Sequence, residues 1–204
     1  MTLDLELHQL DSWVKYSSSN FIQLICAAGA PMYCLDFVMV GALKRTLSLA
    51  DGISAMIKSQ NMGCARAILR MQLDTVSRLL AYTYVDNPEQ MARAVIGGSQ
   101  IKQFKSRDGR KLLDGYLIDQ LTKEYPWARK VYDFTSGYVH FSEKQFFDSV
   151  VSAGGDGGNN LQLVIGQTDS KFSEDSWIET LVCFNHLLKI IEKLLDKYSL
   201  EKTA

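Results

Sequence analysis

A chain of 204 residues is long enough for one well-filled hydrophobic core but short for two, so we expect a single domain over residues 1–204. Its 22 Lys and Arg almost balance its 23 Asp and Glu, which gives a net charge of −1. This balance provides no overall field that would favour nucleic acid, a membrane surface or an acidic partner. Any charged binding site must therefore be local.

The cysteine pattern indicates the cellular compartment. The four cysteines lie in apolar stretches at Cys26, Cys34, Cys64 and Cys183. None of them forms a Cys-x-x-Cys pair, so the pattern favours reduced thiols over disulfides or zinc. The N-terminus lacks the basic and apolar regions of a signal peptide. We therefore expect a cytoplasmic protein.

One apolar run, residues 21–43, raises the question of a membrane span. Pro31 divides the run, and Gln23 and Asp36 would both need polar partners in lipid. Two packed helices that meet near Pro31 explain the same residues, because proline suits the first turn of a helix. We therefore expect a buried helical hairpin and no membrane partner.

Helical patterns recur along most of the chain. The predicted helices span residues 11–28, 31–59 with a bend near 51–52, 61–84, 87–97, 111–124, 126–138 and 173–198. Asn61 is a predicted N-cap, Pro88 suits a first helical turn, and the pair Gly97-Gly98 predicts a helix end. In the last helix, apolar residues gather on one side and charged residues on the other.

The segment before the last helix has a different pattern. Residues 145–152 and 161–167 are rich in Phe, Val, Leu and Ile, and they flank a glycine-rich stretch at 154–160. This pattern predicts a β-hairpin with a long tip. The predicted fold is therefore mainly all-α, an up-and-down array of about six or seven helices with a small β-hairpin inserted at about 145–167.

A ladder of charged residues lies on the predicted third helix. Arg66, Arg70, Asp74 and Arg78 follow one another at intervals of four residues, so they share one stripe of the helix. Most of the remaining circumference is apolar, which is typical of a buried helix whose charged stripe lines an inner cleft. An ordinary solvated face with weak Arg-Asp pairs explains the same spacing. Both interpretations stay open.

The segment 132–142 concentrates hydroxyls, aromatic residues and one of the three histidines near a predicted helix end. Histidine is the side chain that most often serves as a general acid or base, and Ser136 lies four residues before His140. A histidine that caps the helix end is an equally good interpretation. His140 and Glu143 form a single His-x-x-Glu spacing, which is weak support for a metal, so we expect neither a metal nor a cofactor.

A basic stretch lies in residues 102–111, around Phe104. Its five basic residues are Lys102, Lys105, Arg107, Arg110 and Lys111. Such a loop is able to contact nucleic-acid phosphates, but aromatic residues are too sparse here for a base-stacking platform. A solvated connector is the more common explanation.

Two stretches together resemble a known superfamily. These are Cys-Ala-Arg-Ala-Ile-Leu-Arg-Met-Gln-Leu-Asp at 64–74 and Tyr-x-x-x-Ser-Gly-Tyr-Val-His-x-Ser at 132–142. They resemble uncharacterised bacterial helical proteins related to the HEPN superfamily. The resemblance implies a small helical domain that forms a homodimer, a role in toxin–antitoxin or phage-defence systems and, in active members, metal-independent ribonuclease activity.

The HEPN signature is an Arg followed, after four to six residues, by a His. His140 matches the histidine, whereas Asp133, Phe134 and Thr135 occupy the window for the arginine. The hypothesis is therefore that Arg66 or Arg70 supplies the charge from a neighbouring helix.

Two functional hypotheses follow. In the first, His140 and Arg70 are catalytic or anion-stabilising, and a polar cleft binds RNA, a nucleotide or another anionic ligand. The ligand-binding residues in this hypothesis are Arg66, Asp74, Ser136 and Tyr138. In the second, the same residues form a buried structural Arg-Asp-His network in a non-enzymatic module for dimerisation or for binding a partner protein. The residues themselves leave open whether the protein is an enzyme.

Overall fold

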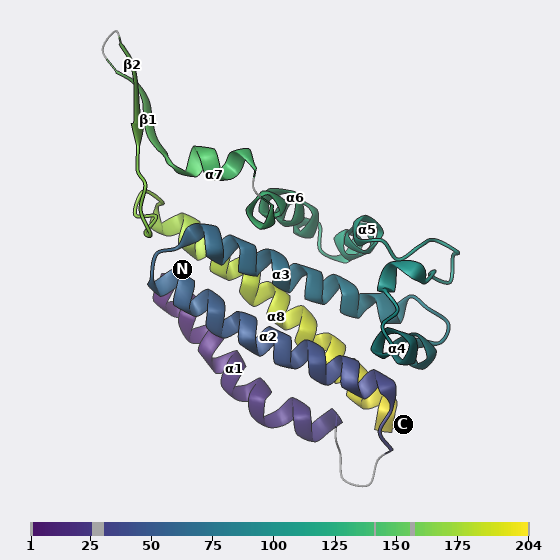
Figure 1. Cartoon of the computed structure of the whole chain (residues 1–204). Helices are drawn as coiled ribbons and strands as arrows, with labels where there is room; N and C mark the ends of the chain where they lie inside the picture. The colour runs from purple at the N-terminus through teal and green to yellow at the C-terminus, as the bar shows by residue number, and fades with distance from the viewer. Residues whose placement is uncertain (1, 26–30, 141, 156–157, 204) are drawn as a thin grey trace.

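The computed structural model describes residues 2–25, 31–140, 142–155 and 158–203. This part of the chain contains eight α-helices, two short 3₁₀ helices and two strands (Figure 1). The α-helices are α1 Leu3–Ile25, α2 Cys34–Lys58, α3 Met62–Leu80, α4 Pro88–Ile96, α5 Asp114–Glu124, α6 Trp127–Val139, α7 Glu143–Asp148 and α8 Glu174–Thr203. The 3₁₀ helices are η1 Ala81–Thr83 and η2 Ile101–Gln103, and the strands are β1 Val150–Gly155 and β2 Gly158–Leu163. The predicted helical class is confirmed.

Four long helices form the body of the molecule. α1 packs against α2 and α8, and α3 packs against the same two helices, so the four surround one core. Phe21, Leu43, Leu73 and Phe184 are fully buried there, one from each helix. α5 and α6 cover the other side of α3, which makes α3 the central helix of the fold (Figure 1).

The first three long helices run up and down, but α8 departs from the predicted up-and-down array. It runs in the same direction as α3 (Figure 1). The backbone N–H of Asp169, just before α8, donates to the carbonyl of Gln60, just before α3, so the two helices begin side by side. The cause is the long connection from α3 to α8, in which α4 to α7 carry the chain back to its starting end.

Several predicted helix bounds need correction. The first helix begins at Leu3 rather than residue 11, because Leu10 and the polar Glu6 are already buried in the bundle. The second is one continuous helix across the predicted bend, and the third ends at Leu80, where a 3₁₀ turn follows. Residues 26–28 of the predicted first helix lie outside the described residues. The predicted cap Asn61 is confirmed, since its side chain accepts a hydrogen bond from Cys64 N.

The predicted hairpin segment begins as a helix. α7 lies where the first strand was expected, because Ser142 and Gln145 cap its first turn: Ser142 N donates to Gln145 Oε1 at 2.8 Å. β1 and β2 then pair antiparallel, with Val150 opposite Leu163. The second strand ends at Leu163 rather than at residue 167. Residues 156–157 of the glycine-rich stretch lie outside the described residues.

The start of α3 provides the first stability prediction. The Asp169 carboxylate accepts hydrogen bonds from Met62 N at 2.7 Å and from Gly63 N at 3.4 Å, so it satisfies two backbone donors at this helix end. We expect Asp169→Ala to lower the free energy of unfolding by about 1 to 2 kcal/mol, because those donors lose their acceptor. Urea unfolding followed by circular dichroism measures this change. A variant as stable as the wild type would show that the contact adds nothing.

No described helix combines the length and the apolar character that a membrane span requires.

Candidate functional site

The charged ladder on α3 does not line one cleft. Arg66 and Arg70 face α6 and are buried, with 9% and 8% of their surfaces exposed. Arg78, two turns further on, is exposed and pairs with Asp114 at the start of α5, with Arg78 Nη2 at 3.3 Å from Asp114 Oδ1. The spacing correctly placed these residues on one stripe, but the neighbours of α3 divide that stripe between two environments.

Arg66 is enclosed by aromatic side chains. Its guanidinium carbon lies 4.9 Å from the ring centre of Phe134, 5.0 Å from that of Tyr138 and 4.7 Å from that of Phe172. Arg66 Nη1 donates to the Tyr138 hydroxyl at 2.5 Å. Burial raises the pKa of Tyr138, and the nearby Asp148 adds to this shift, although the Arg66 cation acts against it. Tyr138 is therefore a neutral phenol that accepts from Arg66.

Arg70 joins α3 to α6 in a second contact. It forms an ion pair with Asp74 on its own helix, and its guanidinium carbon lies 3.9 Å from the ring centre of Tyr132. Arg70 Nε also donates to Ser136 Oγ at 3.4 Å. We call these contacts, together with the Arg66–Tyr138 hydrogen bond, the α3–α6 network. Five of the six predicted site residues belong to it: Arg66, Arg70, Asp74, Ser136 and Tyr138.

His140 stays outside the α3–α6 network. It is the exposed C-cap residue of α6, and its backbone N–H donates to the carbonyl of Ser136 at 3.4 Å. Within the described part of the chain, its imidazole forms no hydrogen bond or ion pair with Arg66 or Arg70. The predicted pairing of His140 with Arg70 is therefore not present in this chain, because α6 ends there and the histidine turns outward.

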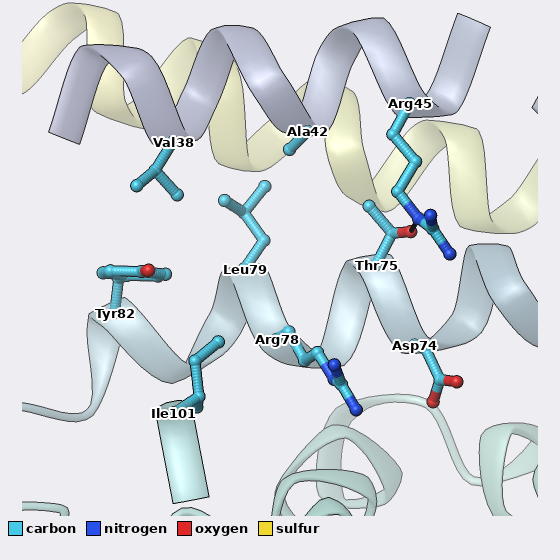
Figure 2. Close-up of a pocket in the computed structure, with 9 residues that line it drawn as sticks. All are labelled: Val38, Ala42, Arg45, Asp74, Thr75, Arg78, Leu79, Tyr82 and Ile101. Carbon is cyan, nitrogen blue, oxygen red and sulfur yellow. Dashed lines mark hydrogen bonds between the residues drawn. The ribbon is translucent and has the colours of Figure 1, made fainter. Parts of the chain in front are cut away.

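A cleft of about 360 Å³ lies between α2, α3 and η2 (Figure 2). We call it the Arg45 cleft. It is lined by Val38, Ala42, Arg45, Asp74, Thr75, Arg78, Leu79, Tyr82 and Ile101. Figure 2 shows that the charged side chains gather at one end, while Val38, Leu79, Tyr82 and Ile101 gather at the other.

The charged end of the Arg45 cleft holds two exposed guanidinium groups. Arg45 Nε donates to Thr75 Oγ1 at 3.0 Å, which directs the side chain from α2 toward α3 (Figure 2). Thr75 in turn donates to the carbonyl of Met71 at 2.9 Å. The only carboxylate that lines the cleft, Asp74, is already paired with Arg70. Arg45 and Arg78 thus face the cleft, while the negative charge of Asp74 is already balanced by Arg70.

Arg45 was not among the predicted site residues. The available signal was the spacing of Val38, Ala42 and Arg45, which lie four and three residues apart and so share one face of α2. That spacing alone did not show which helix this face meets. The partner residue, Thr75, lies 30 positions away in the sequence.

The basic stretch at 102–111 is a structured loop. Arg107 Nη1 and Nη2 donate to the carbonyls of Thr83 and Val85 at 3.0 and 2.7 Å, and Arg110 lies over the ring of Tyr116. These two arginines therefore hold the loop to the body of the protein. Lys102, next to Ile101 of the Arg45 cleft, is exposed.

Metal ligation was also considered for His140 and Glu143. Among the described residues, no group of three or more His, Cys, Asp or Glu side chains is placed to hold a metal ion. Glu143 is the first residue of α7, beyond the end of α6 that His140 caps.

No family model, curated protein or solved structure matches this chain. The resemblance to HEPN proteins therefore stays a prediction that rests on the two sequence stretches alone.

Proposed function

We propose that the protein binds a nucleotide or another small phosphate-bearing molecule in the Arg45 cleft. The observation that carries this proposal is the division of the cleft into a charged end with Arg45 and Arg78 and an apolar end with Tyr82 and Ile101 (Figure 2). A molecule with a phosphate at one end and a flat, largely apolar group at the other matches both halves.

Charge favours a phosphate at the Arg45 end. Guanidinium groups present N–H donors in a planar fork that matches phosphate oxygens. Arg45 uses Nε for Thr75, and within the part of the chain that the structure describes its two terminal nitrogens form no hydrogen bond or ion pair, so they are available. Arg78 pairs with Asp114 while both side chains are about half exposed, and such a pair contributes at most about 1 kcal/mol. A doubly charged phosphate is therefore able to compete with Asp114.

Size favours a mononucleotide over RNA. A volume of about 360 Å³ lies at the small end of the range for small-molecule sites. Binding a nucleic-acid strand needs a longer basic groove with aromatic residues on which successive bases stack. The chain has a net charge of −1, and two arginines of its basic loop are engaged with the protein itself.

Calorimetric titration with AMP tests the proposal. Adenosine and inorganic phosphate are the matched halves of this probe. We expect AMP to bind the wild type more tightly than either half, and Arg45→Met to weaken AMP binding by about ten- to a hundredfold, because one charge-assisted contact is lost.

Lys44→Met is the matched control, because it removes a neighbouring exposed charge on α2 that does not line the cleft. It should leave AMP affinity unchanged. Equal weakening by Lys44→Met and Arg45→Met, or no AMP binding by the wild type, would contradict the proposal.

The ribonuclease hypothesis needs its own test. Because His140 is exposed and, among the described residues, forms no hydrogen bond with the buried arginines, we expect His140→Ala to change the free energy of unfolding by less than about 0.5 kcal/mol. We also expect it to leave AMP binding unaltered. Incubation of single-stranded RNA and tRNA in EDTA compares this variant with the wild type. Cleavage by the wild type that disappears in His140→Ala would support the metal-independent ribonuclease and a HEPN-like role in defence.

A non-enzymatic interaction module is the second candidate function. The observation that favours it is that the two arginines of the α3–α6 network are buried, and that Arg70 is paired with Asp74 and Ser136 within the network, as in a structural network. In this second function, the protein would form a homodimer or bind a partner protein, and both remain predictions. Titration of the wild type with AMP separates the two candidates, since only the first requires an occupied Arg45 cleft.

A further inference from the structure

A second cleft lies on the other side of α3, between α3, α6 and α8, with a volume of about 280 Å³. We call it the Arg66 cleft. Leu69, Val131 and Phe134 give it apolar walls, and Arg66 is its one buried cation. It shares no lining residue with the Arg45 cleft, so any ligand here is independent of the function proposed above.

Arg66 is a buried cation without a counterion. In the described part of the chain no carboxylate lies within ion-pair distance of its guanidinium, and Nε is buried without a hydrogen-bond partner. The surrounding aromatic rings offset part of the cost of burying the charge. A buried cation with an unpaired Nε donor nevertheless favours an anion, because proteins rarely leave such groups unsatisfied.

The other polar groups of the Arg66 cleft narrow the chemistry of the ligand. Thr135 and Thr180 donate their hydroxyl protons to carbonyls of their own helices, at 2.6 and 2.9 Å. They are therefore left mainly as acceptors and add no donors for an anion. Lys130 and Glu179 are exposed and of opposite charge, so together they add no net charge. One buried positive charge within apolar walls matches a monoanion with an apolar body.

We propose that the Arg66 cleft binds a small amphipathic carboxylate, with its carboxylate on Arg66 and its hydrocarbon part against Leu69, Val131 and Phe134. The cleft volume of about 280 Å³ lies just below the range of about 300 to 1,000 Å³ that is usual for small-molecule sites, so it suits a ligand of few non-hydrogen atoms. Octanoate, with ten such atoms, is a suitable probe, and octanol is its uncharged counterpart.

Cys183 also lines the Arg66 cleft and serves as a reporter for occupancy. Burial raises the pKa of this thiol to about 11, with a smaller contribution from Glu179, so its alkylation is slow and is best followed near pH 9. Peptide mass spectrometry distinguishes Cys183 from the exposed Cys64, which does not line the cleft and is the internal control.

We expect saturating octanoate to slow the alkylation of Cys183 by iodoacetamide at least about fivefold and to leave Cys64 unaffected, because only the cleft is covered. Octanol should protect much less. Unchanged alkylation of Cys183, or equal protection by octanol and octanoate, would overturn the proposal.

Two variants locate the octanoate site. Arg66→Gln should remove the preference for octanoate over octanol. Val131→Phe keeps Arg66 but should fill the Arg66 cleft, so we expect it to weaken octanoate binding at least about tenfold, as measured by calorimetry. This variant tests the location of the site even if Arg66→Gln does not fold. Lys189→Gln is the control, because Lys189 is an exposed residue of α8 that does not line the cleft, and this variant should bind octanoate as the wild type does. Octanoate binding that survives Val131→Phe would overturn the assignment.

Discussion

Lys202→Met is expected to lower the free energy of unfolding by about 3 to 5 kcal/mol at neutral pH, because it leaves the buried charge of Asp36 without its cation. Lys202 Nζ lies 2.8 Å from Asp36 Oδ1, and the two side chains are only 3% and 0% exposed. The pair joins the end of α8 to the start of α2. Denaturant unfolding of wild type and variant gives the difference directly.

The effect of Lys202→Met should depend on pH. Burial by itself would raise the pKa of Asp36, but hydrogen bonds from Lys202, Tyr33 N and Tyr198 outweigh it, and the pKa lies below its usual value. The stabilisation is therefore complete above the ordinary carboxyl range and is lost as the pH falls through it, near or below about 4. The difference between wild type and variant should shrink over that window.

The cluster of Asp36, Tyr198 and Lys202 also predicts that the free energy of unfolding declines at high pH. Burial raises the pKa of Tyr198, and its hydrogen bond to Asp36 raises it further. A raised pKa favours the neutral phenol in the folded protein, so this contribution is present below about pH 10 and declines above it.

Lys197→Met is the matched control for Lys202→Met. Lys197 lies on the same helix, but it is 62% exposed and pairs with the equally exposed Glu201. Its loss should change stability by less than about 0.5 kcal/mol. Equal destabilisation by both variants would show that burial of the Asp36–Lys202 pair is irrelevant to stability.

Arg70→Met is expected to lower the free energy of unfolding by about 2 to 3 kcal/mol. The change removes the ion pair with Asp74 and the hydrogen bond to Ser136, and it leaves the Asp74 carboxylate without its cation. Adding Asp74→Asn should recover about 1 kcal/mol, since the stranded carboxylate is then neutral. A double-mutant cycle of urea unfolding measures this coupling. Strictly additive effects would show that the pair has no structural role.

Local sequence signals predicted much of the secondary structure. As predicted, the side chain of Asn61 accepts a hydrogen bond from the first turn of α3, Pro88 is the first residue of α4, and Gly98 takes a φ of 98° after the end of α4. Such signals act within a few residues. They are therefore readable from the sequence wherever no distant contact overrides them.

Long-range pairs could not be predicted from the sequence, because local signals act only within a few residues. Asp36 and Lys202 lie 166 positions apart, and nothing in the sequence around either residue indicates the other. The extension of the first helix to Leu3 likewise depends on a distant contact, because Asn185 Nδ2 on α8 donates to Glu6 Oε2 at 2.8 Å. The periodicity of α1 alone does not show this partner.

The candidate site was only half predictable. Spacing correctly placed Arg66 and Arg70 on one stripe, and their wide apolar surroundings indicated a buried helix. The interpretation of His140 as the residue that caps the helix end is confirmed. The sequence did not show that aromatic residues of α6 would cover the two arginines. It also did not show that Arg45 of α2 would reach α3.

The most direct test of the account is a methyl NMR titration of the wild type with AMP. We predict saturable shifts of the Val38, Leu79 and Ile101 methyl groups, because these residues form the apolar end of the Arg45 cleft. The Leu69 and Val131 methyl groups of the Arg66 cleft should stay unchanged. Shifts confined to Leu69 and Val131, or no saturable shift at Val38, Leu79 and Ile101, would contradict nucleotide binding in the Arg45 cleft.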